Sequence, residues 1–125
     1  MSNSKILVVD DEPFILRTLT FVLKKEGYDI ATAVNGEEAL AQIRASEPSL
    51  VFVDAMMPKK DGYQVAQEVR DDPTLKRQPY IIMLTARGQE SDREKAERVG
   101  INEFMTKPFS PSKVAARVRE ILERT

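Results

Sequence analysis

The sequence contains neither cysteine nor histidine. Without cysteine, disulfides and thiolate metal sites are excluded, and nothing opposes a cytoplasmic location. Without histidine, any metal ion must be held by oxygen ligands, which favours Mg²⁺, Mn²⁺ or Ca²⁺ over zinc. A Ser-His or Cys-His nucleophile pair is excluded for the same reason.

Long apolar runs are also missing, and the polar start Met1–Lys5 is unlike a signal peptide, so we expect no membrane segment. The net charge is −1, from 19 basic and 20 acidic residues. This balance argues against a nucleic-acid or membrane partner recruited by bulk charge. With 125 residues, of which 42% are hydrophobic, the chain has the size of one domain, residues 1–125.

Five short apolar runs alternate with segments of helical periodicity. The predicted strands are Ile6–Val9, Tyr28–Val34, Leu50–Val53, Tyr80–Leu84 and Ile101–Met105. The helical segments carry apolar stripes at Leu16, Leu19 and Leu23; Ala39, Leu40 and Ile43; Val65, Ala66 and Val69; Ala96 and Val99; and Val114, Val118, Ile121 and Leu122. Such alternation predicts an α/β fold with a parallel sheet and helices on both faces.

Turn and cap residues mark the ends of these helices. Gly27 and Gly100 are plausible helix stops, and Asn35 and Ser110 are plausible N-caps. The fourth helix, roughly Glu90–Val99, is polar nearly all round, so it should be the least firmly held helix.

Polar side chains gather where the predicted strands end. Asp10 and Asp11 follow the first strand, Asp54 the third, Thr85 the fourth, and Lys107 the fifth. Because the carboxyl ends of parallel strands share one edge of a sheet, we expect these side chains in one crevice.

Three close carboxylates repel one another unless a cation neutralises them, and Mg²⁺ fits this set of oxygen donors best. An ammonium and a hydroxyl beside them complete the groups needed for phosphoryl transfer onto an aspartate, Asp54. Taken singly, each residue has a plainer interpretation: a strand-end acid can solvate a loop or cap a helix, and Lys107 can be an exposed charge. Their joint occurrence at matching strand ends favours the functional interpretation.

The chain resembles, over nearly its whole length, the receiver domain of two-component response regulators (the CheY-like superfamily). The matching segments are Val8–Pro13, Val53–Pro58, Asp61–Gly62, Met83–Arg87 and Phe104–Phe109. The resemblance implies a flavodoxin-like (βα)5 fold, a doubly wound parallel five-stranded sheet in the order 2-1-3-4-5. It also implies a cis peptide at Lys107-Pro108.

The resemblance also implies a role for each site residue. Asp54 would accept the phosphoryl group from a phosphohistidine on a sensor histidine kinase or histidine phosphotransfer protein, and Thr85 and Lys107 would contact it. Mg²⁺ would be bound by Asp11, Asp54 and the backbone carbonyl of Met56, with Asp10 acting through a water. Thr85 and Phe104 would form the switch that repacks the face made by the fourth helix, fifth strand and fifth helix. Met56 and Arg87 would cover the phosphoryl group.

That face would contact a downstream protein partner, with no direct nucleic-acid binding, in a monomer or a phosphorylation-dependent homodimer. From Thr85 to Leu122 the chain resembles the winged-helix transcription-factor branch, which pairs receivers through charges here. Glu103 and Arg117 carry the same charge sign as is usual at these positions in that branch. Lys113, Val99 and Asn102 instead occupy positions where that branch usually has acids.

Two alternatives from other functional classes stay open on the residues alone. One is a Mg²⁺-dependent phosphatase with an aspartate nucleophile, although such enzymes typically carry Asp-x-Asp after the first strand, where this chain has adjacent Asp10 and Asp11. The other is a pseudo-receiver that only binds partners. A receiver itself is no enzyme in the ordinary sense, since it catalyses only its own phosphorylation and dephosphorylation.

Overall fold

The computed structural model describes residues 4–86 and 93–123, and in these ranges five parallel strands form one sheet in the order β2-β1-β3-β4-β5. The strands are β1 (Lys5–Val9), β2 (Asp29–Ala33), β3 (Leu50–Asp54), β4 (Tyr80–Ala86) and β5 (Glu103–Lys107). The helices are α1 (Pro13–Lys25), α2 (Gly36–Ser46), α3 (Gly62–Arg70), α4 (Arg93–Val99) and α5 (Pro111–Leu122). The predicted α/β class, parallel sheet and strand order are confirmed.

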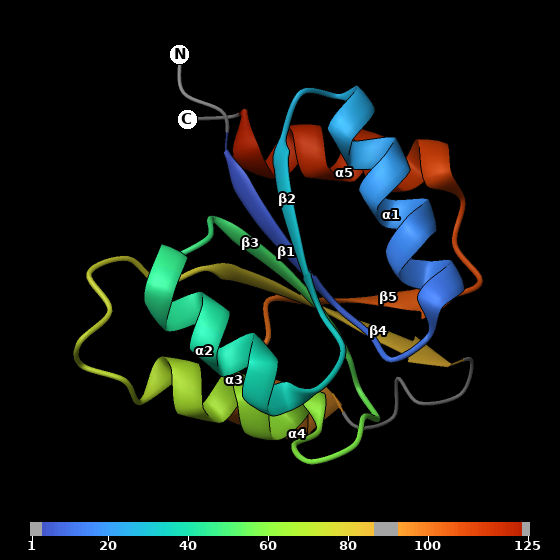
Figure 1. Cartoon of the computed structure of the whole chain (residues 1–125). Helices are drawn as coiled ribbons and strands as arrows, with labels where there is room; N and C mark the ends of the chain where they lie inside the picture. Colours follow the sequence, from blue (N-terminus) through green and yellow to red (C-terminus); the bar gives the residue numbers. More distant parts are fainter. Residues whose placement is uncertain (1–3, 87–92, 124–125) are drawn as a thin grey trace.

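Helices cover both faces of the sheet, with α1 and α5 on one side and α2, α3 and α4 on the other (Figure 1). Two apolar clusters correspond to these two layers, one on each face. The central strand β3 is buried along its whole length, including the terminal Asp54. Because β3 is central in the sheet and helices cover both of its faces, its sequence is a continuous apolar run and not an alternating one.

Two glycines end helices as predicted. Gly27 (φ +97°) follows α1 and Gly100 (φ +84°) follows α4, both in the left-handed region that glycine adopts without steric cost. After α4, the N–H of Gly100 donates to the carbonyl of Glu97, and the N–H of Ile101 donates to the carbonyl of Ala96. This pair of bonds is the Schellman motif, which satisfies carbonyls left unpaired at a helix end.

The same motif corrects the prediction for the fifth strand. We expected a strand over Ile101–Met105, but β5 runs from Glu103 to Lys107. Ile101 is buried as the apolar contact that accompanies the helix stop, not as a strand residue. Ile101, the apolar residue after Gly100, therefore belongs to the end of α4, and the predicted strand start was two residues too early.

Side-chain N-caps mark the starts of α2, α3 and α5. The side chain of Asn35 accepts from the N–H of Glu38, and that of Ser110 accepts from the N–H of Lys113, as predicted. Asp61 and Gln64 form a reciprocal capping box at the start of α3. The predicted cis peptide at Lys107-Pro108 is also present.

The predicted weakness of α4 agrees with its burial, for the seven residues that are described. Ala96 is buried and Val99 is partly buried against the same cluster. The side chains of Glu94, Lys95, Glu97 and Arg98 are exposed. Residues 90–92 of the predicted helix lie outside the described residues. None of the helices in the described ranges combines the length and the apolar character required to cross a bilayer.

Gly62, the first residue of α3, allows this helix to approach the end of β3. Its N–H donates to the carbonyl of Ala55 at 3.0 Å. A Cβ atom added here would lie 2.5 Å from the backbone oxygen of Asp54 and 3.2 Å from the Cα of Ala55. Glycine is thus required where α3 packs against the strand end that carries Asp54.

We expect Gly62→Ala to lower the free energy of unfolding by about 1–3 kcal/mol, because backbone atoms must move to admit the methyl group. Urea unfolding measures this change. The control Gln67→Ala alters an exposed position of the same helix and should change stability by about 0.5 kcal/mol or less. Equal effects of the two substitutions would contradict the close approach.

Candidate functional site

Adjacent strands bring Asp10, Asp11 and Asp54 together. Val9 pairs with Val53 in the sheet, so Asp10, immediately after β1, lies beside Asp54, the last residue of β3. One carboxylate oxygen from each of the three aspartates lies within 4.8 Å of the others. Asp10 is fully buried, Asp54 is 9% exposed, and Asp11 is exposed. The predicted gathering of these acids at one edge of the sheet is confirmed.

Lys107, the last residue of β5, directs its ammonium into this group of acids. Its Nζ lies 2.8 Å from Asp10 Oδ2, 2.9 Å from Glu12 Oε1 and 3.6 Å from Asp54 Oδ2. Burial by itself lowers the pKa of Lys107, but its contacts with Asp10 and Glu12 outweigh burial and hold this pKa above its usual value. The side chain therefore stays a cation.

One ammonium does not offset this much negative charge. Burial and, next in size, the charge of Asp10 raise the pKa of Asp54, which is about 6 instead of the usual 3.8. Lys107 and the N–H of Met56, which donates to Asp54 Oδ1 at 3.4 Å, act in the opposite direction without cancelling the rise. The crevice therefore keeps an excess of negative charge, which a further cation would neutralise.

Two buried polar atoms lack hydrogen-bond partners among the described residues: Asp10 Oδ2 and Thr85 Oγ1. Asp10 Oδ2 nevertheless has an ionic partner, because Lys107 Nζ lies 2.8 Å from it. Thr85 is fully buried near the carboxyl end of β4. A buried hydroxyl without a partner costs stability, and bound ligands commonly compensate such costs at functional sites.

The donor set fits a hard divalent cation. Carboxylate oxygens from three aspartates converge, and one of them is exposed to solvent, which leaves space for the waters that Mg²⁺ retains. These are the oxygen donors that the absence of histidine and cysteine predicts.

Thr85 and Phe104 lie on the same face of the sheet. Phe104 pairs with Met83 in register, and both pack in the cluster under α2, α3 and α4. Thr85 follows two residues after Met83, so strand alternation directs it to that face. A cavity of about 290 Å³ between α4 and β5 is lined by Phe104 and by Ala96, Glu97, Ile101, Asn102 and Glu103.

Three more residues bear on the site: Glu12, Met56 and Arg87. The sequence prediction gave Glu12 no role in the site, but its carboxylate contacts Lys107. Its position directly after the two aspartates was the signal that could have suggested this contact. Met56 is exposed, with 64% of its surface accessible, whereas Arg87 lies outside the described residues.

The sequence model of the family described as the response regulator receiver domain matches residues 6–119. The chain belongs to this family. The match covers all of β1 except Lys5, the other four strands and most of α5, and with them every aspartate of the acidic crevice. The resemblance found in the sequence is therefore confirmed, and the chain is a receiver domain of the two-component response-regulator type.

Curated and solved relatives agree with this assignment. The chain is 45% identical over 123 residues to the alkaline phosphatase synthesis transcriptional regulatory protein PhoP of Bacillus subtilis (strain 168), covering 98% of this chain and 50% of that protein. It thus spans about half the length of such relatives.

Two solved structures share the fold. The chemotaxis response regulator CheY4 of Vibrio cholerae superposes with a TM-score of 0.88 at 28% identity, covering 97% of this chain and 100% of that one. The receiver domain of the sensor histidine kinase PA1611 of Pseudomonas aeruginosa PAO1, with a magnesium ion coordinated in its active-site cleft, superposes with a TM-score of 0.84 at 25% identity, covering 98% and 99% of the two chains.

The raised pKa of Asp54 predicts a pH-dependent stability. Because the folded protein holds this proton more tightly than the unfolded chain, ionisation costs stability as the pH rises from about 4 to about 6, and the cost persists above that range. Without divalent cations, we expect Asp54→Asn to be about 1–2 kcal/mol more stable than the wild type at about pH 8, but nearly equal to it below about pH 4.

Urea unfolding at the two pH values measures this difference. Asp29→Asn makes the same chemical change at an exposed position on β2 and should show no such gain at high pH. A gain for Asp54→Asn that is the same at both pH values would contradict the electrostatic explanation.

Proposed function

We propose that Asp54 accepts a phosphoryl group from a phosphohistidine on a sensor histidine kinase or histidine phosphotransfer protein, and that the acylphosphate switches the α4-β5-α5 face. The observation that carries this proposal is the position of Asp54. It is a buried carboxylate at a strand end, beside two further aspartates, a lysine ammonium and the hydroxyl of Thr85, which has no hydrogen-bond partner among the described residues. Family membership supports the same role.

The transfer is a substitution at phosphorus. A carboxylate oxygen of Asp54 attacks, the new P–O bond forms as the P–N bond to the donor imidazole breaks, and the imidazole nitrogen keeps the electron pair. With a pKa of about 6, Asp54 is mainly ionised at neutral pH and can act as the nucleophile. Lys107 then pairs with a phosphoryl oxygen, and the hydroxyl of Thr85 donates to another.

We propose that Asp11, Asp54 and the backbone carbonyl of Met56 hold Mg²⁺, with Asp10 acting through a water. When bound, the ion would neutralise the carboxylates and the phosphoryl oxygens. The fully buried Asp10 suits contact with the ion through a water, and the exposed Asp11 suits direct contact with it. The magnesium ion in the related PA1611 receiver supports this part of the proposal.

Phosphorylation would be transmitted by Thr85 and Phe104. As the Thr85 hydroxyl turns to the phosphoryl group, it vacates volume on the face that it shares with Phe104, and the ring can follow. The cavity of about 290 Å³ beside Phe104 gives the ring room to change its packing against α4.

The partner that reads this face is proposed to be a protein, without direct contact of residues 1–125 to nucleic acid or membrane. In relatives such as PhoP, which are about twice as long and are transcriptional regulators, the remainder could supply that reader within one chain. The two alternatives, an aspartate-based phosphatase and a pseudo-receiver, receive no support from the relatives, and the complete acid set argues against the pseudo-receiver.

Incubation with acetyl phosphate and Mg²⁺, followed by intact-mass measurement, tests the proposal. We expect one added phosphate on the wild type and none on Asp54→Asn, because the amide is not a nucleophile. Asp29→Asn, a matched change at the opposite edge of the sheet, should be phosphorylated like the wild type. Absence of a phosphate adduct on the wild type would overturn the receiver function, and sustained donor turnover without an adduct would favour the phosphatase.

Charges on the output face are paired within the chain. The guanidinium of Arg117 donates to both oxygens of Glu103, at 2.6–3.1 Å, and to Glu120 at 3.2 Å. The hydroxyl of Tyr80 donates to Glu103 at 2.6 Å and accepts from Arg117 at 3.2 Å. Pairing of Arg117 with a second copy would have to break these bonds, and the exposed Lys113 adds a like charge on the same helix.

We therefore expect the protein to remain a monomer in sedimentation experiments, both alone and with Mg²⁺ and beryllofluoride, a mimic of the phosphoryl group. Arg117→Ala, which removes the internal pair, should also sediment as a monomer. A shift of the beryllofluoride-loaded wild type to twice the mass, abolished in Arg117→Ala, would contradict this expectation and show that Arg117 exchanges its partners.

A further inference from the structure

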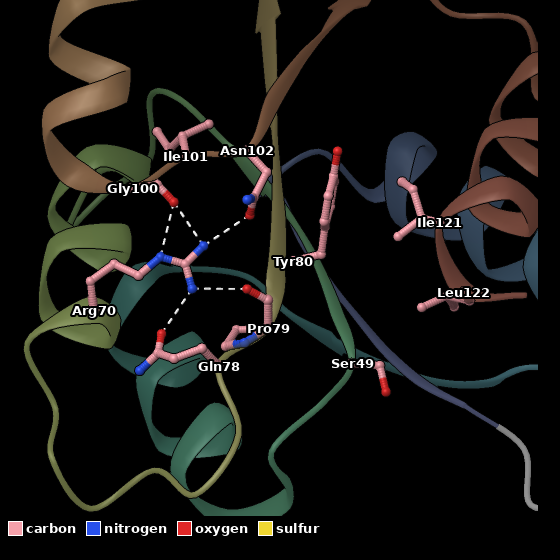
Figure 2. Close-up of a pocket in the computed structure, with 10 residues that line it drawn as sticks. All are labelled: Ser49, Arg70, Gln78, Pro79, Tyr80, Gly100, Ile101, Asn102, Ile121 and Leu122. Carbon is pink, nitrogen blue, oxygen red and sulfur yellow. Dashed lines mark hydrogen bonds between the residues drawn. The ribbon is translucent and has the colours of Figure 1, made fainter. Parts of the chain in front are cut away.

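Arg70, the last residue of α3, donates hydrogen bonds to two chain connections, the one that leads into β4 and the one that leads into β5 (Figure 2). Both connections enter the sheet at the end opposite the acidic crevice. Its Nε and Nη2 donate to the carbonyl of Gly100 at 2.9 and 2.7 Å, and Nη2 also donates to Asn102 Oδ1 at 2.9 Å. Its Nη1 donates to Gln78 Oε1 at 2.8 Å and to the carbonyl of Pro79 at 2.9 Å.

These bonds use all five N–H donors of the guanidinium. Every acceptor is an uncharged amide oxygen, from the backbone or from an Asn or Gln side chain. Arg70 lines a surface groove of about 650 Å³, but it has no donor left for an anionic ligand in that groove. Its role is therefore to fix the groups that it contacts.

Gly100 is adapted to this contact in two independent ways. Its φ of +84° favours glycine, and a Cβ atom added to it would lie 2.6 Å from Arg70 Cγ and 2.7 Å from Arg70 Nε. The stem of the arginine thus passes directly over the glycine, and both residues are needed for the same close approach.

The carbonyl of Gly100 lies just beyond the C-terminus of α4, where a positive charge stabilises a helix. Other attachments of α4 are few in its described residues: Ala96 is buried, Val99 is partly buried, and Lys95 lies 4.3 Å above the ring of Tyr63. Two hydrogen bonds from a guanidinium are thus a major attachment of this end of α4 to α3.

Asn102 extends the attachment into the sheet. Its Oδ1 also accepts from the N–H of Ile81 at 2.6 Å, and its own N–H donates to the carbonyl of Ile81 at 2.9 Å. Arg70 therefore fixes the residue that precedes β5, two positions before Phe104, against the first part of β4.

We propose that Arg70 is a positioning residue for the output face: it anchors the C-terminal end of α4 and the start of β5 to α3. Repacking on phosphorylation is then confined to the opposite end, at Thr85 and the first turn of α4. The confinement rests on the proposed function, whereas the anchoring does not, so the two are tested separately.

The anchoring is tested with Arg70→Lys, which keeps the charge but cannot reach both groups of acceptors with a single nitrogen. Hydrogen exchange of the Gly100, Ile101 and Asn102 amides, each of which donates a backbone bond, should become about tenfold faster, because bonds to a charged group are lost. The Asp29 amide, bonded to the carbonyl of Ser4 on the far side of the sheet, should be unchanged.

Arg44→Lys is the matched control, since the half-exposed Arg44 also lies in the last turn of its helix but bonds to the carboxylate of Asp72. It should leave the three amides within about twofold of the wild type. Equal acceleration of the Asp29 amide in Arg70→Lys would indicate a general loss of stability and overturn the anchoring, as would unchanged exchange at all three amides.

The confinement is tested by adding Mg²⁺ and beryllofluoride. In the wild type, exchange should change around Glu94 and Lys95 but not at Gly100–Asn102, whereas in Arg70→Lys the change should extend to Gly100–Asn102. Phosphate uptake from acetyl phosphate should stay within about twofold, because Arg70 is remote from Asp54. Equal changes at both ends of α4 in the wild type would overturn the confinement. If exchange changes nowhere in residues 93–104, both the confinement and the proposed switch are overturned. The anchoring is not affected by that result, because the experiment without beryllofluoride decides it.

Discussion

Repulsion among carboxylates is the constraint on which the rest of this structure depends. Asp10 and Asp54 are buried side by side with Asp11 close by, and the cation held among them in the described structure is the ammonium of Lys107. Such an arrangement persists only if the scaffold is rigid enough to resist the repulsion. The continuous burial of β3 and its pairing with β1 and β4 supply that rigidity.

The two edges of the sheet differ in how fully their polar groups are satisfied. At the carboxyl edge, Asp54 has a raised pKa and Thr85 Oγ1 has no partner among the described residues. At the opposite edge, every donor of Arg70 is used. An edge with unsatisfied groups can respond to an added cation or phosphoryl group, whereas a saturated edge resists change. This asymmetry suits a domain that must hold one end of a helix while the other end moves.

Much of the fold and the site could be predicted from local patterns. The strand-ending acids Asp10 and Asp54 and the Asn35 and Ser110 caps are short-range signals, and a parallel sheet converts strand ends into neighbours. The failure at Ile101 has an equally local cause, since an apolar residue after glycine is compatible with a strand start and with a helix stop. Arg70 and Tyr80 could not be assigned from sequence, because their partners lie 30 and 23 residues away along the chain and no strand-end pattern marks them.

The amino-acid composition restricts the possible chemistry to oxygen ligands, an aspartate nucleophile and a lysine cation, since histidine and cysteine are absent. The sequence also determined the order of strands and helices, because hydrophobic periodicity and caps act over a few residues. Three further properties arise only when the chain is folded: the balance of charge around Asp54, the internal pairing of Arg117 and the use of every donor of Arg70. These depend on burial and on distances of a few ångströms between remote segments, and a pKa or a hydrogen bond is set by such distances and not by sequence spacing.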